Sequence, residues 1–293
     1  MKVLMVSHHW QPYTHHSPSS GYQRLAHYIS PDGGDRAEVL TWEKRGDTYA
    51  ESEPDPAPLV HRIKTPASDV FLERRLMLSW AAMKMGREYD LVHALYSVPA
   101  FFPSLRHPTV ATVHIVPEIT PKDLWLKYKG LYQKSLFRRV KRIIAVSTNL
   151  SQLLTERYSE ERVVYIPHGI DVNVFKPGIV DASELRASLL KDRFSQIALM
   201  VGYHGVSHES VTSLVIRFPD VRFVIVGRPL EGEARQNVVC LSGVSEEKLK
   251  CLYECADVFF RPLTFATANG ALLEAMAMGK PIVIHSIPGV TDY

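Results

Sequence analysis

Short apolar segments rich in β-branched residues alternate with longer segments of helical periodicity along this chain. Apolar runs of this kind are typical of parallel strands whose sheet is covered on both faces. The pattern therefore predicts an α/β fold in which helices connect parallel strands. In the first half we expect strands at 3–7, 37–41, 60–63, 91–94, 109–113, 142–145 and 163–166, helices at 22–29, 70–86, 127–139 and 148–158, and a polar, proline-rich loop at 46–58.

The alternation of strands and helices begins again after a break at Pro177 and Gly178. We therefore expect two Rossmann-like domains facing across a cleft, residues 1–177 and 178–293. Because the last expected strand ends close to Tyr293, we expect the second domain to be incomplete at its C-terminus. The strands expected in this domain are 197–201, 221–226, 238–241, 258–260 and 281–285.

Composition and missing motifs exclude several classes of function. The net charge of +3 is too small to predict a nucleic-acid partner. Neither G-x-G-x-x-G nor a P-loop follows any expected strand, so we expect no cofactor. No Cys/His set joins Cys240, Cys251 and Cys255, which predicts buried reduced thiols, no metal and a cytoplasmic location. We also expect no signal peptide and no membrane span, which needs roughly eighteen apolar residues.

A predicted helix near the end of the chain is the strongest candidate for a ligand site. The segment 256–284, ADVFFRPLTFATANGALLEAMAMGKPIVI, predicts a strand, a polar loop and a helix that begins near Asn269 and Gly270. The first N–H groups of a helix bind a diphosphate well. Glu274 lies in the second turn of the helix, within reach of a sugar hydroxyl on the same ligand.

Two features of the first half also fit a ligand at the carboxyl ends of strands. Ser20 and Gly21 precede a predicted helix, and a loop of such small residues can approach a phosphate or a sugar closely. The same residues also serve as an ordinary helix cap. His114 directly follows the expected strand TVATV, and we favour it as a cleft residue over a locally bonded loop histidine.

Seven segments, taken together and in order, are specific enough to indicate a family. With these segments in the order found here, the chain resembles retaining glycosyltransferases of the GT-B fold, specifically glycosyltransferase family 4 (glycosyl transferases group 1). The resemblance implies that a nucleoside-diphosphate-sugar donor binds mainly to the C-terminal domain. It implies a saccharide or lipid-linked acceptor on the N-terminal domain, as in polysaccharide biosynthesis. The segments are YDLVHALYSVPA, PTVATVH, KRIIAVSTNLSQLL, ERVVYIPHGIDVNVFKP, VRFVIVG, SEEKLKCLYECADVFFRPL and ALLEAMAMGKPIVI.

The resemblance also implies roles for single residues. Glu274 matches the family glutamate that holds the ribose of the donor, and His114 matches a histidine near the transferred sugar. Ser20 and Gly21 match the glycine-rich loop after the first strand. Residues 269–270 match the loop whose backbone amides face the diphosphate.

Three positions depart from the family pattern. Ala266 stands where the family has a glutamate that contacts the transferred sugar. Tyr203 and His208 stand where it has an arginine and a lysine that neutralise the leaving diphosphate. These departures keep open a catalytically degenerate binding or scaffold protein, and a nucleotide-sugar epimerase fits the motif order less well. The candidates for the missing positive charge are His204, His208, Arg228 and Arg261.

A basic stretch with interleaved aromatic residues, KDLWLKYKGLYQKSLFRRVKR, spans 122–142. An amphipathic basic helix can lie on anionic lipid, which would place the protein at the inner face of the membrane as a peripheral protein. Alternatively, the apolar stripe of the helix packs on its own sheet and the basic residues are only solvated.

Overall fold

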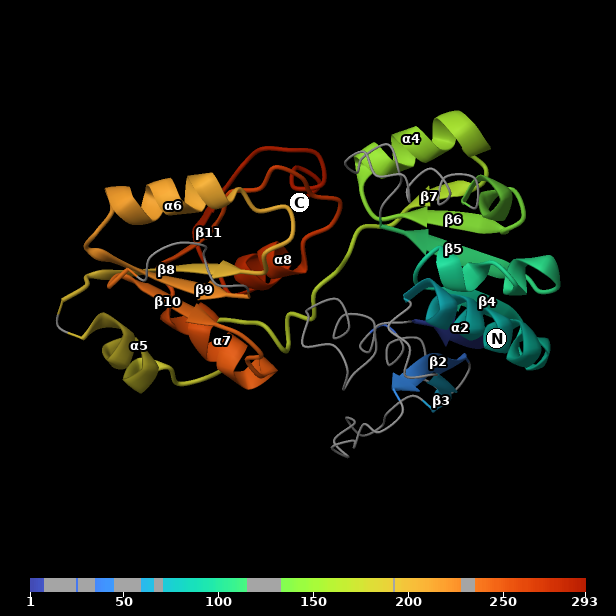
Figure 1. The fold of residues 1–293 in the computed structure, drawn as a ribbon, viewed down its shortest axis with the longest axis horizontal. Helices are drawn as coiled ribbons and strands as arrows, with labels where there is room; N and C mark the ends of the chain where they lie inside the picture. The colour runs from blue at the N-terminus through green and yellow to red at the C-terminus, as the bar shows by residue number, and fades with distance from the viewer. Residues whose placement is uncertain are drawn as a thin grey trace. The chain divides into compact units, whose positions relative to one another are not determined.

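The structure, a computed structural model, describes residues 1–7, 25, 35–44, 59–65, 71–114, 133–191, 193–227 and 235–293. These residues form two compact units, one ending at Pro167 and the other spanning His168–Tyr293 (Figure 1). Each unit contains one parallel sheet with helices packed against it, as the α/β prediction requires.

The first unit is built on a seven-stranded sheet of order β3-β2-β1-β4-β5-β6-β7, in which all neighbouring strands are parallel. Its described elements are β1 (Lys2–Val6), β2 (Arg36–Lys44), β3 (Val60–Thr65), α2 (Phe71–Met85), η1 (Gly86–Glu88), β4 (Leu91–Ala94), η2 (Val98–Ala100), η3 (Pro103–Leu105), β5 (Thr109–Val113), β6 (Arg142–Ala145), α4 (Thr148–Tyr158) and β7 (Val163–Tyr165).

The interior strand β1 shows why an uninterrupted apolar run is needed here. Val3 and Met5 face one core cluster, whereas Leu4 and Val6 face another that includes Leu78 of α2. Successive side chains of a strand point to opposite faces, and both faces of this strand are covered. Every position of β1 after Lys2 is therefore buried.

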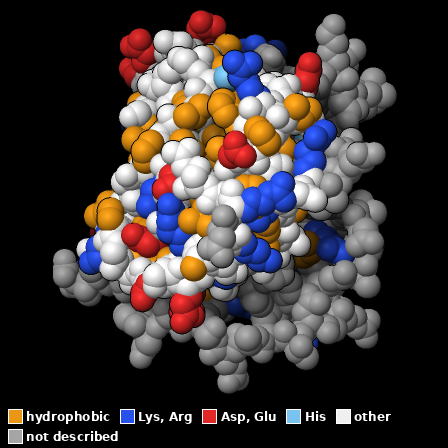
Figure 2. Space-filling model, turned by 90° about the vertical axis from the view of Figure 1, so that its left-hand side faces the viewer, with side chains coloured by type: hydrophobic (Ala, Val, Ile, Leu, Met, Phe, Trp, Pro, Cys, Tyr) orange, Lys and Arg blue, Asp and Glu red, His pale blue; other side chains and the backbone are white. Residues whose placement is uncertain are grey.

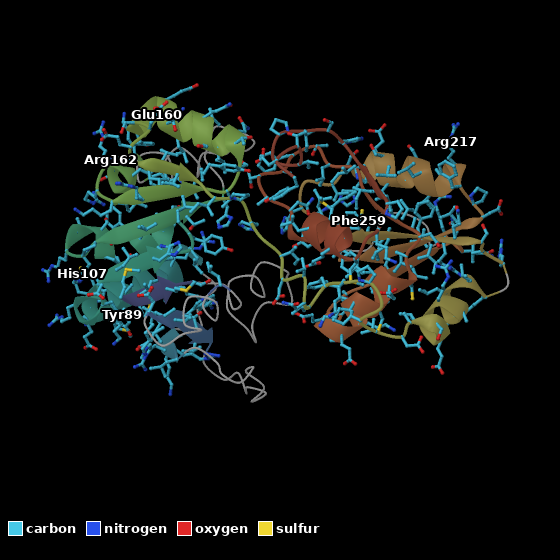
Figure 3. All side chains as sticks on the ribbon, turned by 180° about the vertical axis from the view of Figure 1, so that it is seen from behind. Tyr89, His107, Glu160, Arg162, Arg217 and Phe259 are labelled. Carbon is cyan, nitrogen blue, oxygen red and sulfur yellow. The ribbon has the colours of Figure 1, made fainter. Side chains whose placement is uncertain are left out.

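A buried carboxylate lies among the first residues of the strands of this sheet. Glu38 of β2 accepts hydrogen bonds from Tyr89, which Figure 3 labels, and from His61 over 2.8 Å. Lys2 and Arg36 add positive charge at 3.4 Å and 3.2 Å. Burial by itself raises the pKa of Glu38, but the hydrogen bonds and charges outweigh it and hold that pKa at about 2.

The second unit contains a five-stranded parallel sheet of order β10-β9-β8-β11-β12. Its central strand β8 again divides its apolar side chains between two cores, with Leu199 on one side and Met200 on the other. The described elements are α5 (Ser183–Leu190), β8 (Gln196–Val201), α6 (His208–Arg217), β9 (Val221–Val226), β10 (Val238–Leu241), α7 (Glu246–Cys255), β11 (Val258–Arg261), α8 (Gly270–Ala277) and β12 (Ile282–Ile284).

Every expected strand is present, with small differences at the ends, of which the extension of β2 to Lys44 is the largest. The expected helix 22–29, apart from residue 25, and the expected loop 46–58 lie outside the described residues. Of the expected helix 127–139, the described part is helical over 133–137.

The two units divide between Pro167 and His168, earlier in the chain than the boundary expected after Pro177. The reason is Phe175, which is buried in the core of the second unit with its ring centroid 6.2 Å from that of Tyr253. Residues 168–177 therefore belong to the second unit, although Pro177 and Gly178 interrupt the pattern at their end.

The described residues bear on four expectations from the sequence, which concern membrane spans, metal sites, charge and the burial of the cysteines. Within these ranges no helix is long and apolar enough to cross a bilayer, and no three His, Cys, Asp or Glu side chains form a metal-binding group. Acidic and basic side chains are interspersed over the face shown in Figure 2. The cysteines are free thiols, but the expected burial is wrong for Cys240, which is exposed on the edge strand β10.

Candidate functional site

The strand order of the second sheet reverses between β8 and β11. From β8 the chain adds β9 and β10 on one side, and it then returns to add β11 and β12 on the other. In open parallel sheets, ligands bind beyond the carboxyl ends of the strands at such a reversal. Here the reversal is flanked by the loop 202–207, which follows β8, and the loop 262–269, which follows β11.

These two loops are joined by backbone hydrogen bonds. Ser207 N–H donates to the carbonyl oxygen of Pro262, and Thr264 N–H donates to that of Gly205, each over 2.7 Å. Gly205 has a φ of +70°, and a Cβ at this position would lie 2.2 Å from the carbonyl oxygen of Phe265. Only glycine fits at this crossing, and the two loops are therefore held as one unit.

Arg261, the last residue of β11, places its guanidinium between the two loops. Its Nη1 donates to Oδ1 of Asn269, and its Nη2 donates to the carbonyl oxygen of His204 over 3.3 Å. The guanidinium lies against Gly202, where a Cβ would be 3.0 Å from Nη2. Arg261 is only 8% exposed. This single side chain connects both loops with the start of α8.

Asn269 is the N-cap of α8. Its Oδ1 accepts a hydrogen bond from Leu272 N–H over 3.1 Å, which satisfies one amide of the first turn. The first amides of a helix have no partner within the helix, so Gly270 and Ala271 are positioned to donate to a ligand.

Two side-chain donors of this cluster have no acceptor among the described residues. They are Nε of Arg261 and Nδ2 of Asn269, and both residues are more than nine-tenths buried. A buried donor without a partner costs about 1–3 kcal/mol. Native proteins contain few such groups, and two at the start of one helix need a specific reason.

Glu274 lies one turn further along α8 and is 3% exposed. The hydroxyl of Tyr253, on α7, donates to Oε2 of Glu274 over 2.8 Å and also approaches the carbonyl oxygen of Ala271 at 3.0 Å. Burial and the Glu274 charge raise the pKa of Tyr253, so this hydroxyl stays protonated. The Tyr253 ring also packs 6.2 Å from Phe259 of β11, labelled in Figure 3.

The charge of Glu274 affects the pKa of Arg261. Burial lowers the pKa of Arg261, and the neighbouring Tyr253 and Glu274 oppose that shift. An arginine nevertheless remains charged near neutral pH because its ordinary pKa is above 12. The site therefore contains a fixed positive charge close to a buried acidic residue.

The other residues predicted for the donor site lie in different surroundings. Tyr203 and His204 stack with ring centroids 4.2 Å apart, and His204 is exposed. His208 is also exposed, as the first residue of α6. Ala266 is partly buried, with its carbonyl oxygen 2.6 Å from where a Cβ of Gly289 would be. Arg228, Ser20 and Gly21 lie outside the described residues.

In the first unit, His114 stands at the carboxyl end of β5, next to the end of β4. Its Nε2 donates to the carbonyl oxygen of Leu95 over 3.0 Å, and its ring lies 4.8 Å from that of Tyr96. Because a carbonyl oxygen only accepts, the neutral ring carries its proton on Nε2 and presents Nδ1 as an acceptor.

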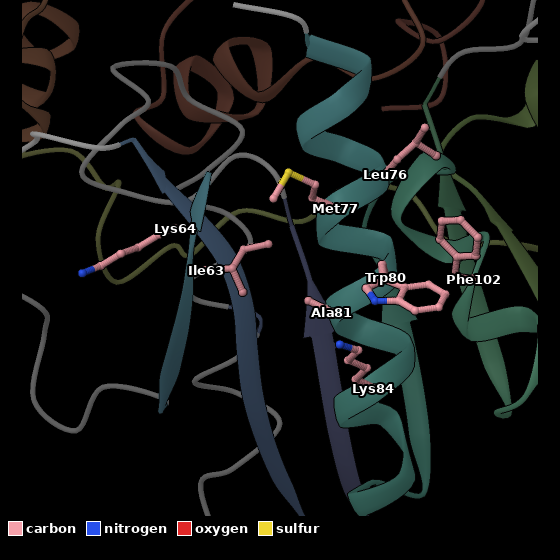
Figure 4. Close-up of a pocket in the computed structure, with 8 residues that line it drawn as sticks. All are labelled: Ile63, Lys64, Leu76, Met77, Trp80, Ala81, Lys84 and Phe102. Atoms are coloured by element: carbon pink, nitrogen blue, oxygen red, sulfur yellow. The ribbon is translucent and has the colours of Figure 1, made fainter. Parts of the chain in front are cut away.

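An apolar cavity of about 510 Å³ lies elsewhere in the first unit, between α2 and the edge strand β3 (Figure 4). None of the predicted site residues lines it, so its size does not make it the candidate site. Its lining consists of Ile63, Lys64, Leu76, Met77, Trp80, Ala81, Lys84 and Phe102.

Comparison with known proteins identifies the family. The model of "Glycosyltransferase Family 4" matches residues 9–174, more than half of the chain. The chain belongs to glycosyltransferase family 4. A second model, "Glycosyl transferases group 1", matches residues 204–293, so the family patterns extend over both units.

Three proteins illustrate the relationships of this glycosyltransferase. The MMP alpha-(1→4)-mannosyltransferase of Mycolicibacterium hassiacum is 27% identical over 86% of the chain and 70% of its own length. Sucrose-phosphate synthase from Thermosynechococcus elongatus has a TM-score of 0.79 at 16% identity, over 99% of the chain and 82% of its own. Anabaena HepE in complex with UDP-glucose has a TM-score of 0.72 at 18% identity, with the same coverage. The structural likenesses support the GT-B fold predicted from the sequence.

Tyr253 is the site residue that sequence reasoning did not find. It lies on α7, and nothing in its neighbourhood, SEEKLKCLYECADVFF, distinguishes it from an ordinary core tyrosine. Only the packing of α7 against α8 shows that its hydroxyl meets Glu274.

Proposed function

We propose that this glycosyltransferase moves a sugar from a nucleoside-diphosphate-sugar donor to a saccharide or lipid-linked acceptor, with retention of the anomeric configuration. The bond between the anomeric carbon and the diphosphate breaks, and a bond to an acceptor hydroxyl oxygen forms. The hydroxyl proton is released and the nucleoside diphosphate leaves. Family membership supports this reaction class, and the structure of HepE with UDP-glucose supports the kind of donor.

The observation that carries the proposal is the buried Glu274 in the second turn of α8, held by Tyr253. A carboxylate is a strong acceptor for sugar hydroxyls, and burying one costs free energy unless hydrogen bonds compensate. In the proposed complex Glu274 accepts from the donor ribose. Gly270 and Ala271 donate their backbone N–H groups to the diphosphate, where the helix dipole favours negative charge.

His114 is proposed to contact the transferred sugar. The donation of Nε2 to Leu95 fixes the direction of the ring at the carboxyl end of β5. Stabilising a leaving diphosphate requires donors that are in place before the reaction begins. In the second unit, hydrogen bonds between the loops after β8 and β11 hold these loops together.

A membrane-bound acceptor is also part of the proposal. Within the described part of 122–142, Leu136 and Phe137 are buried, so these apolar side chains pack inside the unit. Lys134, Arg138 and Arg142 are exposed and can meet anionic lipid. We propose a peripheral position on the cytoplasmic face of the membrane that depends on charge.

Calorimetric titration with UDP-glucose, GDP-mannose and ADP-glucose tests the donor site. One donor should bind to the wild type, and Glu274→Ala should weaken that binding by about tenfold or more, since a hydrogen bond to a charged group is lost. Glu184→Ala, which removes an exposed glutamate of α5, is the matched control.

Three outcomes separate the hypotheses. Unchanged affinity in Glu274→Ala would refute the assignment of this residue. Binding without transfer to any saccharide or lipid-linked acceptor would favour a degenerate binding protein, for which Ala266 in place of a glutamate is the supporting observation. No binding of any nucleotide by the folded chain would overturn the proposed function.

A further inference from the structure

The loop after β8 contains no arginine or lysine. Its sequence, GYHGVS over residues 202–207, provides only histidine as a titratable base. Histidine is the residue type whose charge changes near neutral pH, whereas arginine and lysine carry a permanent charge. His204 and His208 are both exposed. A diphosphate leaving group needs a positive charge that is permanent and fixed in position.

The neighbouring strand brings a permanent cation to the same place. β11 pairs directly with β8, so the end of β11 lies beside the beginning of the loop. Arg261 extends under Gly202, and its Nη2 holds the carbonyl oxygen of His204. Because residue 202 is glycine, the guanidinium can lie directly against the loop backbone.

The same guanidinium also reaches the first turn of α8. Nη1 donates to Oδ1 of Asn269, the oxygen that caps the helix. Nε of Arg261 and Nδ2 of Asn269 are buried donors without an acceptor among the described residues. A positive charge, two unused donors and a helix N-terminus thus meet at one point, and each of them favours an anion rich in acceptor oxygens.

We propose that Arg261 replaces the missing loop cations and supplies the fixed positive charge that recognises the donor diphosphate. This inference rests on the proposed function and makes it more specific. The charge is then supplied from the end of β11, an interior strand, where Asn269 and His204 accept hydrogen bonds from the guanidinium. It acts on the phosphate groups, and it also positions the loop and the helix cap that surround them.

The two roles of Arg261 can be separated by the choice of ligand. Loss of positioning weakens every ligand of the site, including an uncharged nucleoside. Loss of the charge weakens only ligands with phosphate groups, most strongly those with two. The measured quantity is therefore the ratio of the Kd of the nucleoside to the Kd of its diphosphate, for uridine and UDP, guanosine and GDP, and adenosine and ADP.

The experiment compares wild type, Arg261→Gln and Arg261→Lys by calorimetry at low and at physiological salt. In Arg261→Gln the diphosphate should bind about 10–100-fold more weakly, with the nucleoside changed by less than about threefold. In Arg261→Lys the ratio of the nucleoside Kd to the diphosphate Kd should return most of the way to the wild-type value. This ratio should depend on salt as it does in the wild type. Arg217→Gln, at the exposed end of α6, is the control (Figure 3).

A second variant keeps the test valid if Arg261→Gln does not fold. Asn269→Asp preserves the helix cap, because aspartate caps as well as asparagine, and places a negative charge on the guanidinium. It should reduce the ratio as Arg261→Gln does.

The outcomes distinguish this inference from the proposed function. An equal loss of nucleoside and diphosphate affinity, or an unchanged ratio in both variants, would overturn the role of Arg261 and leave the donor site intact. If the wild type binds no nucleoside diphosphate, the proposed function and this inference fail together.

Discussion

Replacing Tyr253 by phenylalanine should remove the support of Glu274 while leaving the core packed. The ring keeps its contacts with Phe175 and Phe259, because only one oxygen is lost. That oxygen donates to Oε2 of Glu274 over 2.8 Å inside a region where Tyr253 is 0% exposed and Glu274 is 3% exposed. A hydrogen bond to a charged group contributes about 1.5–3 kcal/mol, and the buried carboxylate would lose it without gaining water. We expect the second unit to lose that much unfolding free energy.

The assay must report on the second unit alone. All four tryptophans, at positions 10, 42, 80 and 125, precede Pro167, so tryptophan fluorescence follows the first unit. Native-state hydrogen exchange of peptides covering α7 and α8 measures the second unit, and fluorescence-detected urea unfolding of the same samples provides the internal control. Faster exchange in α8 with unchanged fluorescence is the expected result.

Binding data would complete the test of Tyr253→Phe. Because Glu274 is proposed to hold the ribose, the variant should lose more affinity for a ribonucleotide than for its 2′-deoxy analogue. A change in unfolding free energy below about 0.5 kcal/mol would place the variant among ordinary surface substitutions. The claim that Tyr253 supports the carboxylate would then be refuted.

Two further predictions concern the first unit. The depressed pKa of Glu38 gives a contribution to stability of about 1–3 kcal/mol that is complete above its ordinary pKa of 4.5 and disappears as the pH falls towards 2. The difference in unfolding free energy between wild type and Glu38→Gln should therefore shrink between pH 6 and pH 3 in urea titrations, and a constant difference would contradict this account. His114→Ala should lower the transfer rate about tenfold or more while the donor Kd stays within twofold. An equal effect on both would mean that His114 contributes to binding of the donor and not specifically to the transfer step.

Sequence reasoning located the strands well because most contain short apolar runs, and the interior strands β1 and β8 are buried on both faces. It placed the domain boundary after Pro177 because proline and glycine interrupt the pattern locally. The structure divides at Pro167 because Phe175 is buried in the second core. A local break in periodicity does not show which core an adjacent aromatic side chain enters.

The candidate site shows the same limit at the level of single residues. Glu274 and Asn269 could be found because they lie on one predicted helix, where spacing fixes their separation. The sequence left four candidates for the missing positive charge, since nothing local distinguishes Arg261 from His204. Pairing of β11 with β8 brings Arg261 against the loop after β8, and this contact joins residues 57 positions apart. Tyr253 and Glu274 are similarly separated, by 21 positions.

The strand order also has a consequence for how each sheet can assemble. In the first unit, β1 is followed by β2 and β3 outward on one side and then by β4 to β7 outward on the other; the second unit repeats this with β8. Each new strand therefore joins an open edge, and none has to insert between two strands already paired. A chain that emerges from the ribosome in this order can extend both sheets as it is made. The return from the first edge to the second places Arg261 beside the loop after β8, and this pairing comes after β9 and β10 in the order of the chain.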